Sequence, residues 1–211
     1  MFRTLRITTL LFAALMVFGS ASAADWKEGT HYKKLDTPVR TASDSGIEVA
    51  EVFWYGCPHC YNFKPLAEAW EAEAPDYVEY VRIPAALGSS WEPHARAFYA
   101  LEAMDALDTM HDPMFDALAG QRRPLNDGES LAGFVAEHGV DPDEFLANYK
   151  SFGVNARMQQ AQSKIRGARI TGTPSMLVNG KYTISASMAG SLEAMLEVVD
   201  YLVEKEHTEN Q

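Results

Sequence analysis

The sequence predicts an α/β domain into which a block of helices is inserted. Strand-like segments occur near both ends of the chain, at 47–55 and 77–83 and again at 175–178 and 181–184. Between them, residues 92–169 have the pattern of consecutive helices. This order of elements is typical of one sheet domain interrupted by an insertion, because consecutive strands usually join the same sheet.

The first strands and the first helix have distinct local signals. We expect a short strand at 31–35, and residues 47–55 are rich in the β-branched and aromatic residues that favour strands. Gly56 ends this strand, and Pro58 suits the first turn of a helix. We expect that helix to kink near Pro65, and Pro84 to stop the strand at 77–83.

The helical block has several start signals. Ser130 is a suitable N-cap for one helix, and Asp141 followed by proline is suitable for another. The pattern predicts helices at 95–107, 113–119, 130–138, from 141 onward, and at 155–168.

The end of the chain has a hairpin and a closing helix. Asn179-Gly180 is a strong two-residue turn signal between the last two strands. An amphipathic helix follows at 191–204. The polar tail from Lys205 is expected to be frayed.

Composition excludes several classes of protein. The chain has 211 residues, 47% of them hydrophobic and 22% charged, which is typical of a globular protein. A formal net charge of −11 argues against a nucleic-acid partner, which would favour a basic surface. Two cysteines form neither a disulfide-rich scaffold nor a four-cysteine zinc site. Because no interface segment is evident, we expect a monomer.

Residues 1–23 predict a cleavable signal peptide. Arg3 and Arg6 precede a mostly apolar segment at 7–18, and the small residues at 21–23 form a cleavage site. A membrane anchor is the alternative, but a spanning helix needs ~20 apolar residues and this segment is shorter. The mature protein is therefore expected in a compartment where disulfides persist, which is the periplasm in a Gram-negative bacterium.

The cysteine pair is the clearest chemical signal. Cys57 and Cys60 are the only cysteines, and they lie where the strand at 47–55 gives way to a helix that Pro58 begins. A helix N-terminus stabilises a thiolate and lowers its pKa. We expect Cys57 to be exposed, Cys60 to be buried, and His59 to add a donor or positive charge. A stabilised Cys57 thiolate favours the reduced pair, so the pattern predicts a disulfide donor.

Other uses of these cysteines are weaker. A structural disulfide here would close a very short loop, which constrains the chain little. A c-type haem needs a histidine after the second cysteine, where Tyr61 stands. Histidines that would complete a metal site have no ligand-like spacing: His31, His94, His111, His138 and His207. We therefore expect redox catalysis without a metal, flavin or nucleotide cofactor. The alternatives are a disulfide reductase or isomerase, and a non-catalytic peptide- or metal-binding thiol protein.

Two further positions fit a redox site. Thr173-Pro174 comes directly before a strand, where a proline can be cis, and its loop would face the cysteines and bind an extended substrate. Taken alone, this dipeptide is more often an ordinary trans turn. Glu51 lies in an apolar strand six residues before Cys57, where a buried carboxylate would accept or relay the proton of Cys60. A solvent-facing glutamate is the alternative, and Arg82 is a candidate charge partner.

Together these residues resemble the DsbA family of periplasmic thiol:disulfide oxidoreductases. The resemblance rests on FWYGCPHCY at 53–61 and GTPSMLVNGKY at 172–182, and it covers essentially the whole mature chain. It implies a thioredoxin fold with an inserted helical domain. The thioredoxin domain would comprise residues 24–90 and 170–211, and the insertion residues 91–169.

The resemblance also implies a role for each site residue. Cys57 would be the nucleophile that forms a mixed disulfide, and Cys60 the buried resolving cysteine. His59 would tune the pKa of Cys57. Pro174 would be the cis-proline, beside Thr173 in the substrate-contacting loop.

The implied partners are proteins. Glu51 matches the buried glutamate of the family. An apolar surface that includes Met188 would hold newly exported, unfolded chains with cysteine pairs. A DsbB-like, quinone-linked membrane protein would reoxidise the enzyme.

Overall fold

A computed structural model describes residues 25–43 and 46–209. The predicted signal peptide at 1–23 therefore lies outside the described residues. Among the helices of the described ranges, none combines the length and the apolar character needed to cross a membrane.

The described residues contain one five-stranded sheet with the order β1-β5-β4-β2-β3. In the centre, β2 runs parallel to β3 and antiparallel to β4, and the β4–β5 hairpin continues antiparallel to β1. The predicted strands are confirmed, with β2 ending two residues early because Trp54 and Tyr55 already turn toward the first helix. The strands are β1 Lys33–Lys34, β2 Ile47–Phe53, β3 Val78–Pro84, β4 Ser175–Val178 and β5 Tyr182–Ser185.

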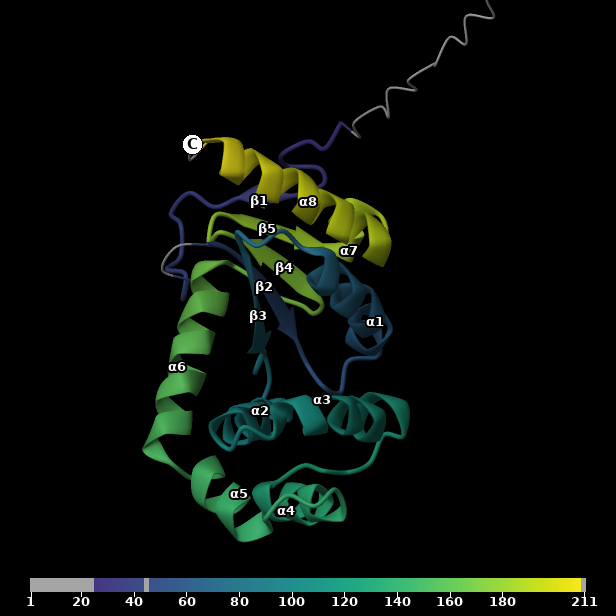
Figure 1. The fold of residues 1–211 in the computed structure, drawn as a ribbon, viewed down its shortest axis with the longest axis vertical. Coiled ribbons are helices and arrows are strands. Elements are labelled where there is room, and N and C mark those ends of the chain that lie inside the picture. Colours follow the sequence, from purple (N-terminus) through teal and green to yellow (C-terminus); the bar gives the residue numbers. More distant parts are fainter. Residues whose placement is uncertain (1–24, 44–45, 210–211) are drawn as a thin grey trace, which may run out of the picture.

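Three helices belong to the sheet region: α1 Pro58–Glu73, α7 Ala186–Ala189 and α8 Leu192–Glu209. The last of these, α8, packs on α1 and on the central strands (Figure 1). The short helix α7 follows the hairpin and was not expected from the sequence. The frayed tail expected from Lys205 is wrong, because α8 continues to Glu209. Its last turns contain the fully buried Glu206, which anchors them.

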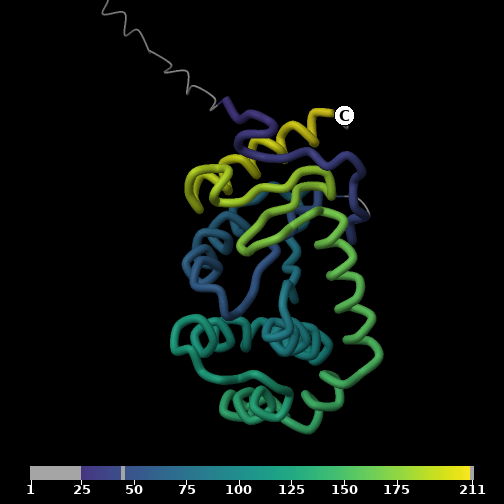
Figure 2. Tube along the Cα trace, turned by 180° about the vertical axis from the view of Figure 1, so that it is seen from behind, coloured from purple at the N-terminus to yellow at the C-terminus, as the bar shows by residue number. Residues whose placement is uncertain are grey.

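The helical block comprises α2 Glu92–Ala103, α3 Leu107–Phe115, the π-helical turn η1 Asp116–Gly120, α4 Gly128–Glu137, α5 Pro142–Tyr149 and α6 Phe152–Gly167. The ribbon in Figure 1 and the Cα tube in Figure 2 both show α2 to α5 gathered beyond one end of the sheet and α6 returning along its side. An ion pair between Lys164 of α6 and the fully buried Glu48 of β2 fixes this return. The α/β fold with inserted helices is therefore confirmed.

Several helix boundaries differ from the sequence prediction. The helix expected at 95–107 ends at Ala103, because Asp105 adopts a left-handed φ of 51° that breaks it, and a separate helix then begins at Leu107. Pro113 consequently lies inside α3 rather than at a helix start. The N-cap of α4 is Asp127, and Ser130 instead completes a capping box with it.

Two other starts were set by side-chain caps. Asp141 caps α5 as predicted. Ser151 caps α6, and the Ser151 hydroxyl accepts a hydrogen bond from the Val154 N–H at 3.1 Å. This helix therefore begins three residues earlier than expected.

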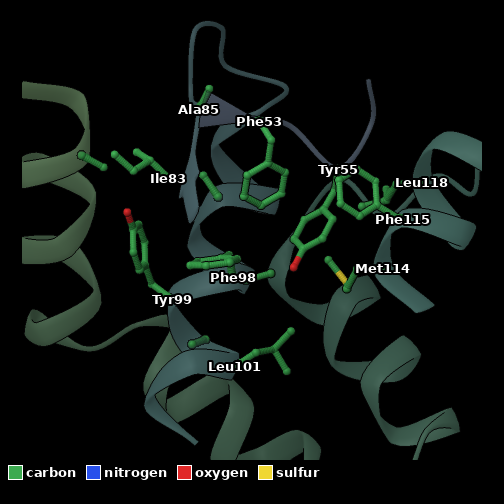
Figure 3. Packing of buried hydrophobic residues seen from close by; sticks show 14 of the residues in the cluster. Phe53, Tyr55, Ile83, Ala85, Phe98, Tyr99, Leu101, Met114, Phe115 and Leu118 are labelled. Carbon is green, nitrogen blue, oxygen red and sulfur yellow. The ribbon is translucent and has the colours of Figure 1, made fainter. Parts of the chain in front are cut away.

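An aromatic cluster joins the end of β2 to the helical block. Phe53 and Tyr55 lie against Phe98 of α2 and Phe115 of α3, as the close view shows (Figure 3). All four side chains are at most 1% exposed. This packing fixes the strand end from which the cysteine motif follows.

Candidate redox site

Cys57 is the N-cap of α1, and Pro58 follows as the first helical residue. Its backbone N–H donates to the Trp54 carbonyl at 2.9 Å, and its sulfur accepts the Cys60 N–H at 3.4 Å. Both cysteines are free thiols in this structure. The strand-to-helix turn thus holds the first sulfur over the open N–H groups of the helix, as the sequence predicted.

The two sulfurs differ in acidity. The hydrogen bond from the Cys60 side chain is the main cause that lowers the pKa of Cys57 to about 5, although burial acts in the opposite direction. Hydrogen bonds from Thr173 and from the backbone N–H groups of Cys60 and His59 lower it further. Burial, followed by the neighbouring Cys57 sulfur, raises the pKa of Cys60. Cys57 is therefore the thiolate at neutral pH and Cys60 the protonated thiol.

One expectation about exposure was wrong. Cys57 is only 7% exposed, and Cys60 is completely buried. The Thr173-Pro174 loop contributes to this burial, since the Cys57 sulfur lies 3.5 Å from the Thr173 carbonyl oxygen. The sequence indicates an open helix start at Cys57 but does not show how closely this loop approaches it.

The Thr173-Pro174 peptide bond is cis in the structure. The loop borders a hollow of about 540 Å³ beside the cysteine motif. His59 lines this hollow from the start of α1, Met188 lines it from α7, and Leu192 lines it from the start of α8. The structure thus brings His59, Thr173, Pro174 and Met188 to one concave surface.

Glu51 is buried in β2, at 4% exposure. Burial raises its pKa to about 7, against the lowering effects of a hydrogen bond from Tyr80 and the charge of Arg82. The Tyr80 hydroxyl donates to the Glu51 carboxylate at 2.7 Å. The solvent-facing alternative for Glu51 is therefore wrong.

The direct partner of Glu51 was missed in the sequence. Arg82 lies beside it in the strand register, but its guanidinium pairs with Glu71 of α1 at 2.5 Å. Tyr80 lies two residues before Arg82, on the same face of β3. The parallel register of β2 and β3 would have indicated this neighbour, but a single sequence does not contain that register.

Two histidines of the helical block are buried in polar contacts rather than grouped. His94 contacts Trp54 and the Leu125 carbonyl, and His111 contacts the Tyr55 hydroxyl at 2.9 Å. Within residues 25–43 and 46–209, no cluster of three histidine, cysteine or acidic residues is arranged to hold a metal ion.

Comparisons with known proteins agree with this geometry. Residues 77–198 match the family described as the DSBA-like thioredoxin domain. The chain is 39% identical over 204 residues to the thiol:disulfide interchange protein DsbA of Pseudomonas aeruginosa, covering 97% of each chain. It is 42% identical over 200 residues to the DsbA of Azotobacter vinelandii, covering 95% of this chain and 94% of that one.

Solved structures show the same similarity in three dimensions. The crystal structure of Pseudomonas aeruginosa DsbA superposes with a TM-score of 0.85 at 39% identity, over 89% of this chain and 98% of that chain. DsbA from Xylella fastidiosa superposes with a TM-score of 0.81 at 33% identity, over 86% and 98% of the two chains.

Proposed function

This chain belongs to the DsbA family of thiol:disulfide interchange proteins, with Cys57–Cys60 as its CxxC pair, and we propose that it works as a disulfide donor. The observation that supports this direction is the low pKa of Cys57, at about 5, beside the raised pKa of Cys60. A stabilised thiolate favours the reduced pair. The disulfide is consequently given away readily.

The proposed reaction moves two electrons from a substrate dithiol to the cysteine pair. A substrate thiolate attacks the Cys57 sulfur of the oxidised pair, which breaks the Cys57–Cys60 bond and leaves both electrons on Cys60. The second substrate thiolate then attacks the substrate sulfur of the mixed disulfide. The substrate disulfide forms, and Cys57 departs as a thiolate, which its low pKa makes a good leaving group.

Proton transfer accompanies each half of the cycle. The Cys60 thiolate takes up a proton as soon as it is released, because its burial favours the neutral thiol. We assign Glu51 as the group that supplies this proton and later accepts it again. A carboxyl with a pKa of about 7 is present in both its protonated and its ionised form at neutral pH.

We propose that the substrate lies in the hollow beside the cysteines. There the Thr173 backbone would bind an extended chain next to Pro174, and Met188 would contact apolar side chains. His59 lowers the pKa of Cys57 through its backbone N–H. The thioredoxin domain would comprise residues 24–90 and 170–211, and the insertion residues 91–169.

The compartment and partners follow from the chemistry. We propose that residues 1–23 direct export to the periplasm, where unfolded proteins with cysteine pairs are the substrates. Each turnover leaves a reduced pair, so a DsbB-like, quinone-linked membrane protein would restore the disulfide.

The test is the redox equilibrium of Cys57–Cys60 against glutathione at pH 7, followed by the fluorescence of Trp54. A potential above roughly −200 mV supports a donor, whereas one below roughly −250 mV supports a reductase. In a parallel assay, Cys57→Ala is expected to abolish oxidation of a reduced substrate protein. Wild-type rates in that variant would contradict the proposed mechanism.

A further inference from the structure

Trp54 contacts both redox cysteines through its backbone. Its carbonyl oxygen accepts the Cys57 N–H at 2.9 Å. Burial raises the pKa of Cys60, and a backbone hydrogen bond from Trp54 acts against that rise. A shift of the Trp54 backbone would therefore change the surroundings of both sulfurs.

The Trp54 side chain is held by the helical block. Its ring stacks on Trp91, with centroids 4.2 Å apart and planes inclined by 5°. Its Nε1–H donates to Nδ1 of His94 in α2 at 2.9 Å. The ring also covers Gly56, leaving no space for a side chain at that position. The residues directly before Cys57 are thus tied to α2.

His94 is itself fixed in one tautomer. The indole of Trp54 can only donate, so Nδ1 of His94 is the acceptor and Nε2 carries the proton. Nε2 then donates to the Leu125 carbonyl at 2.8 Å. The ring is 4% exposed, and burial lowers its pKa, which keeps it neutral. Hydrogen bonds therefore join Leu125 to His94 and His94 to the Trp54 side chain, while the Trp54 carbonyl accepts the Cys57 N–H.

We propose that His94 and Trp54 are positioning residues for the redox pair, and that their hydrogen bond holds the backbone that stabilises the Cys57 thiolate. The inference rests on the proposed function for the role of Cys57. A thiolate at a helix start is stabilised by N–H groups only while these keep their direction. When the side-chain hydrogen bond is lost, the loop moves more freely and the stabilisation falls.

The experiment compares variants that remove this bond in different ways. Trp54→Phe keeps an aromatic ring for the stack on Trp91 but removes the donor. His94→Leu removes the acceptor, whereas the side-chain oxygen of His94→Asn can replace Nδ1. The matched control is Trp70→Phe, because the Trp70 Nε1–H donates to Asp200 at 2.6 Å in a contact between α1 and α8 that does not involve Trp54 or His94.

The readouts are the Cys57 pKa, from thiolate absorbance near 240 nm, the glutathione equilibrium constant and the melting temperature. Trp54→Phe and His94→Leu are expected to raise the Cys57 pKa by about 0.5 to 1 unit. This change lowers the equilibrium constant for oxidation of glutathione by the Cys57–Cys60 disulfide ~3- to 10-fold. His94→Asn should recover at least half of that shift. Trp70→Phe should lose thermal stability to a similar extent with an unchanged pKa.

A pKa shift in Trp54→Phe and His94→Leu no larger than in Trp70→Phe would overturn the inference, because the pair would then only stabilise the fold. If His94→Leu does not fold, Trp54→Phe and His94→Asn decide the question. The wild-type pKa separates this failure from failure of the proposed function. A wild-type value near the ordinary 8.5 would overturn both, whereas a low value that the variants leave unchanged overturns only this inference.

Discussion

The hydroxyl of Tyr80 donates a hydrogen bond to the buried carboxylate of Glu51 across 2.7 Å, from β3 to the neighbouring β2. Burial raises the pKa of Glu51 to about 7, and the hydrogen bond from Tyr80 opposes that rise. Tyr80 therefore lowers the pH range in which the carboxyl exchanges protons. Within the proposed mechanism, this range coincides with neutral pH.

Replacing Tyr80 by phenylalanine is expected to move that range upward. Without the donor, the ionised carboxylate loses about 0.5–1.5 kcal/mol of stabilisation, so the Glu51 pKa should rise by about half a unit to one unit. The step to measure is the release of glutathione from a Cys57 mixed disulfide, in which Glu51 would accept the Cys60 proton. Its pH midpoint should rise by the same amount.

The control for this experiment is Tyr77→Phe. Tyr77 lies just before β3 and stacks on His207, with ring centroids 3.8 Å apart, and the substitution preserves this ring. Its midpoint should equal that of the wild type. A midpoint in Tyr80→Phe that also equals the wild type would mean that Glu51 does not handle the Cys60 proton.

The acidity of Cys57 predicts how the redox potential depends on pH. Below a pKa of about 5 the reduced pair binds two protons, and above it only the buried Cys60 stays protonated. The potential should therefore fall by about 59 mV per pH unit below pH 5 and by about 30 mV per unit from there to pH 8. Glutathione equilibria at several pH values would detect the break, and a single slope near 59 mV throughout would contradict a low pKa of Cys57.

The same low pKa links the stability of the reduced protein to pH. The folded-state pKa of Cys57 is below its unfolded value, so the thiolate contributes stability that is fully present above pH ~8.5 and is lost as pH falls through about 5. In urea unfolding, the free energy of unfolding of the reduced wild type should therefore fall, relative to that of Cys57→Ala, as pH is lowered across this range. An equal pH dependence in the two proteins would exclude this contribution.

The sequence predicted the sheet and the reactive motif because their signals are local. The β-branched and aromatic residues at 47–55 and the turn residues at 179–180 indicate the strands directly, and the cysteines lie beside a helix-starting proline. The Tyr80 and His94 contacts depend instead on how distant segments pack. The left-handed Asp105 that divides two helices had no strong turn signal either.

Gly56 shows how closely Trp54 approaches the cysteine loop. A Cβ at this position would lie inside van der Waals contact with the Trp54 ring. Gly56→Ala is therefore expected to displace the ring and to destabilise the protein by about 1–3 kcal/mol. Gly133→Ala is a suitable comparison, because a Cβ at Gly133 in α4 has no neighbour within 4 Å. That change should stabilise the helix by about 0.5–1 kcal/mol, and equal melting temperatures for the two variants would contradict the steric argument.

Glu206 explains why the end of α8 is ordered. Its carboxylate is completely buried, although it lies near the end of the chain. The same oxygen accepts hydrogen bonds from the Lys181 ammonium at 2.5 Å and from the Asn179 amide at 2.6 Å, and both donors belong to the β4–β5 turn. The last turns of α8 and the hairpin therefore stabilise each other. The polar composition of the tail does not indicate this contact.

Glu206→Ala is consequently expected to reduce the free energy of unfolding by about 1–3 kcal/mol, since the partly buried Lys181 ammonium and the Asn179 amide lose their acceptor. Burial raises the pKa of Glu206, but the hydrogen bonds from Lys181 and Asn179 outweigh it and hold the pKa below its usual value. This contribution is therefore present above pH ~4.3 and is lost as pH falls through the folded-state pKa. Urea unfolding should show a larger difference in stability between wild type and variant at pH 7 than at pH 3. Glu197→Ala, at an exposed position of α8, should change stability by less than about 0.5 kcal/mol at either pH. If the two variants are equally stable at pH 7, Glu206 does not anchor the hairpin.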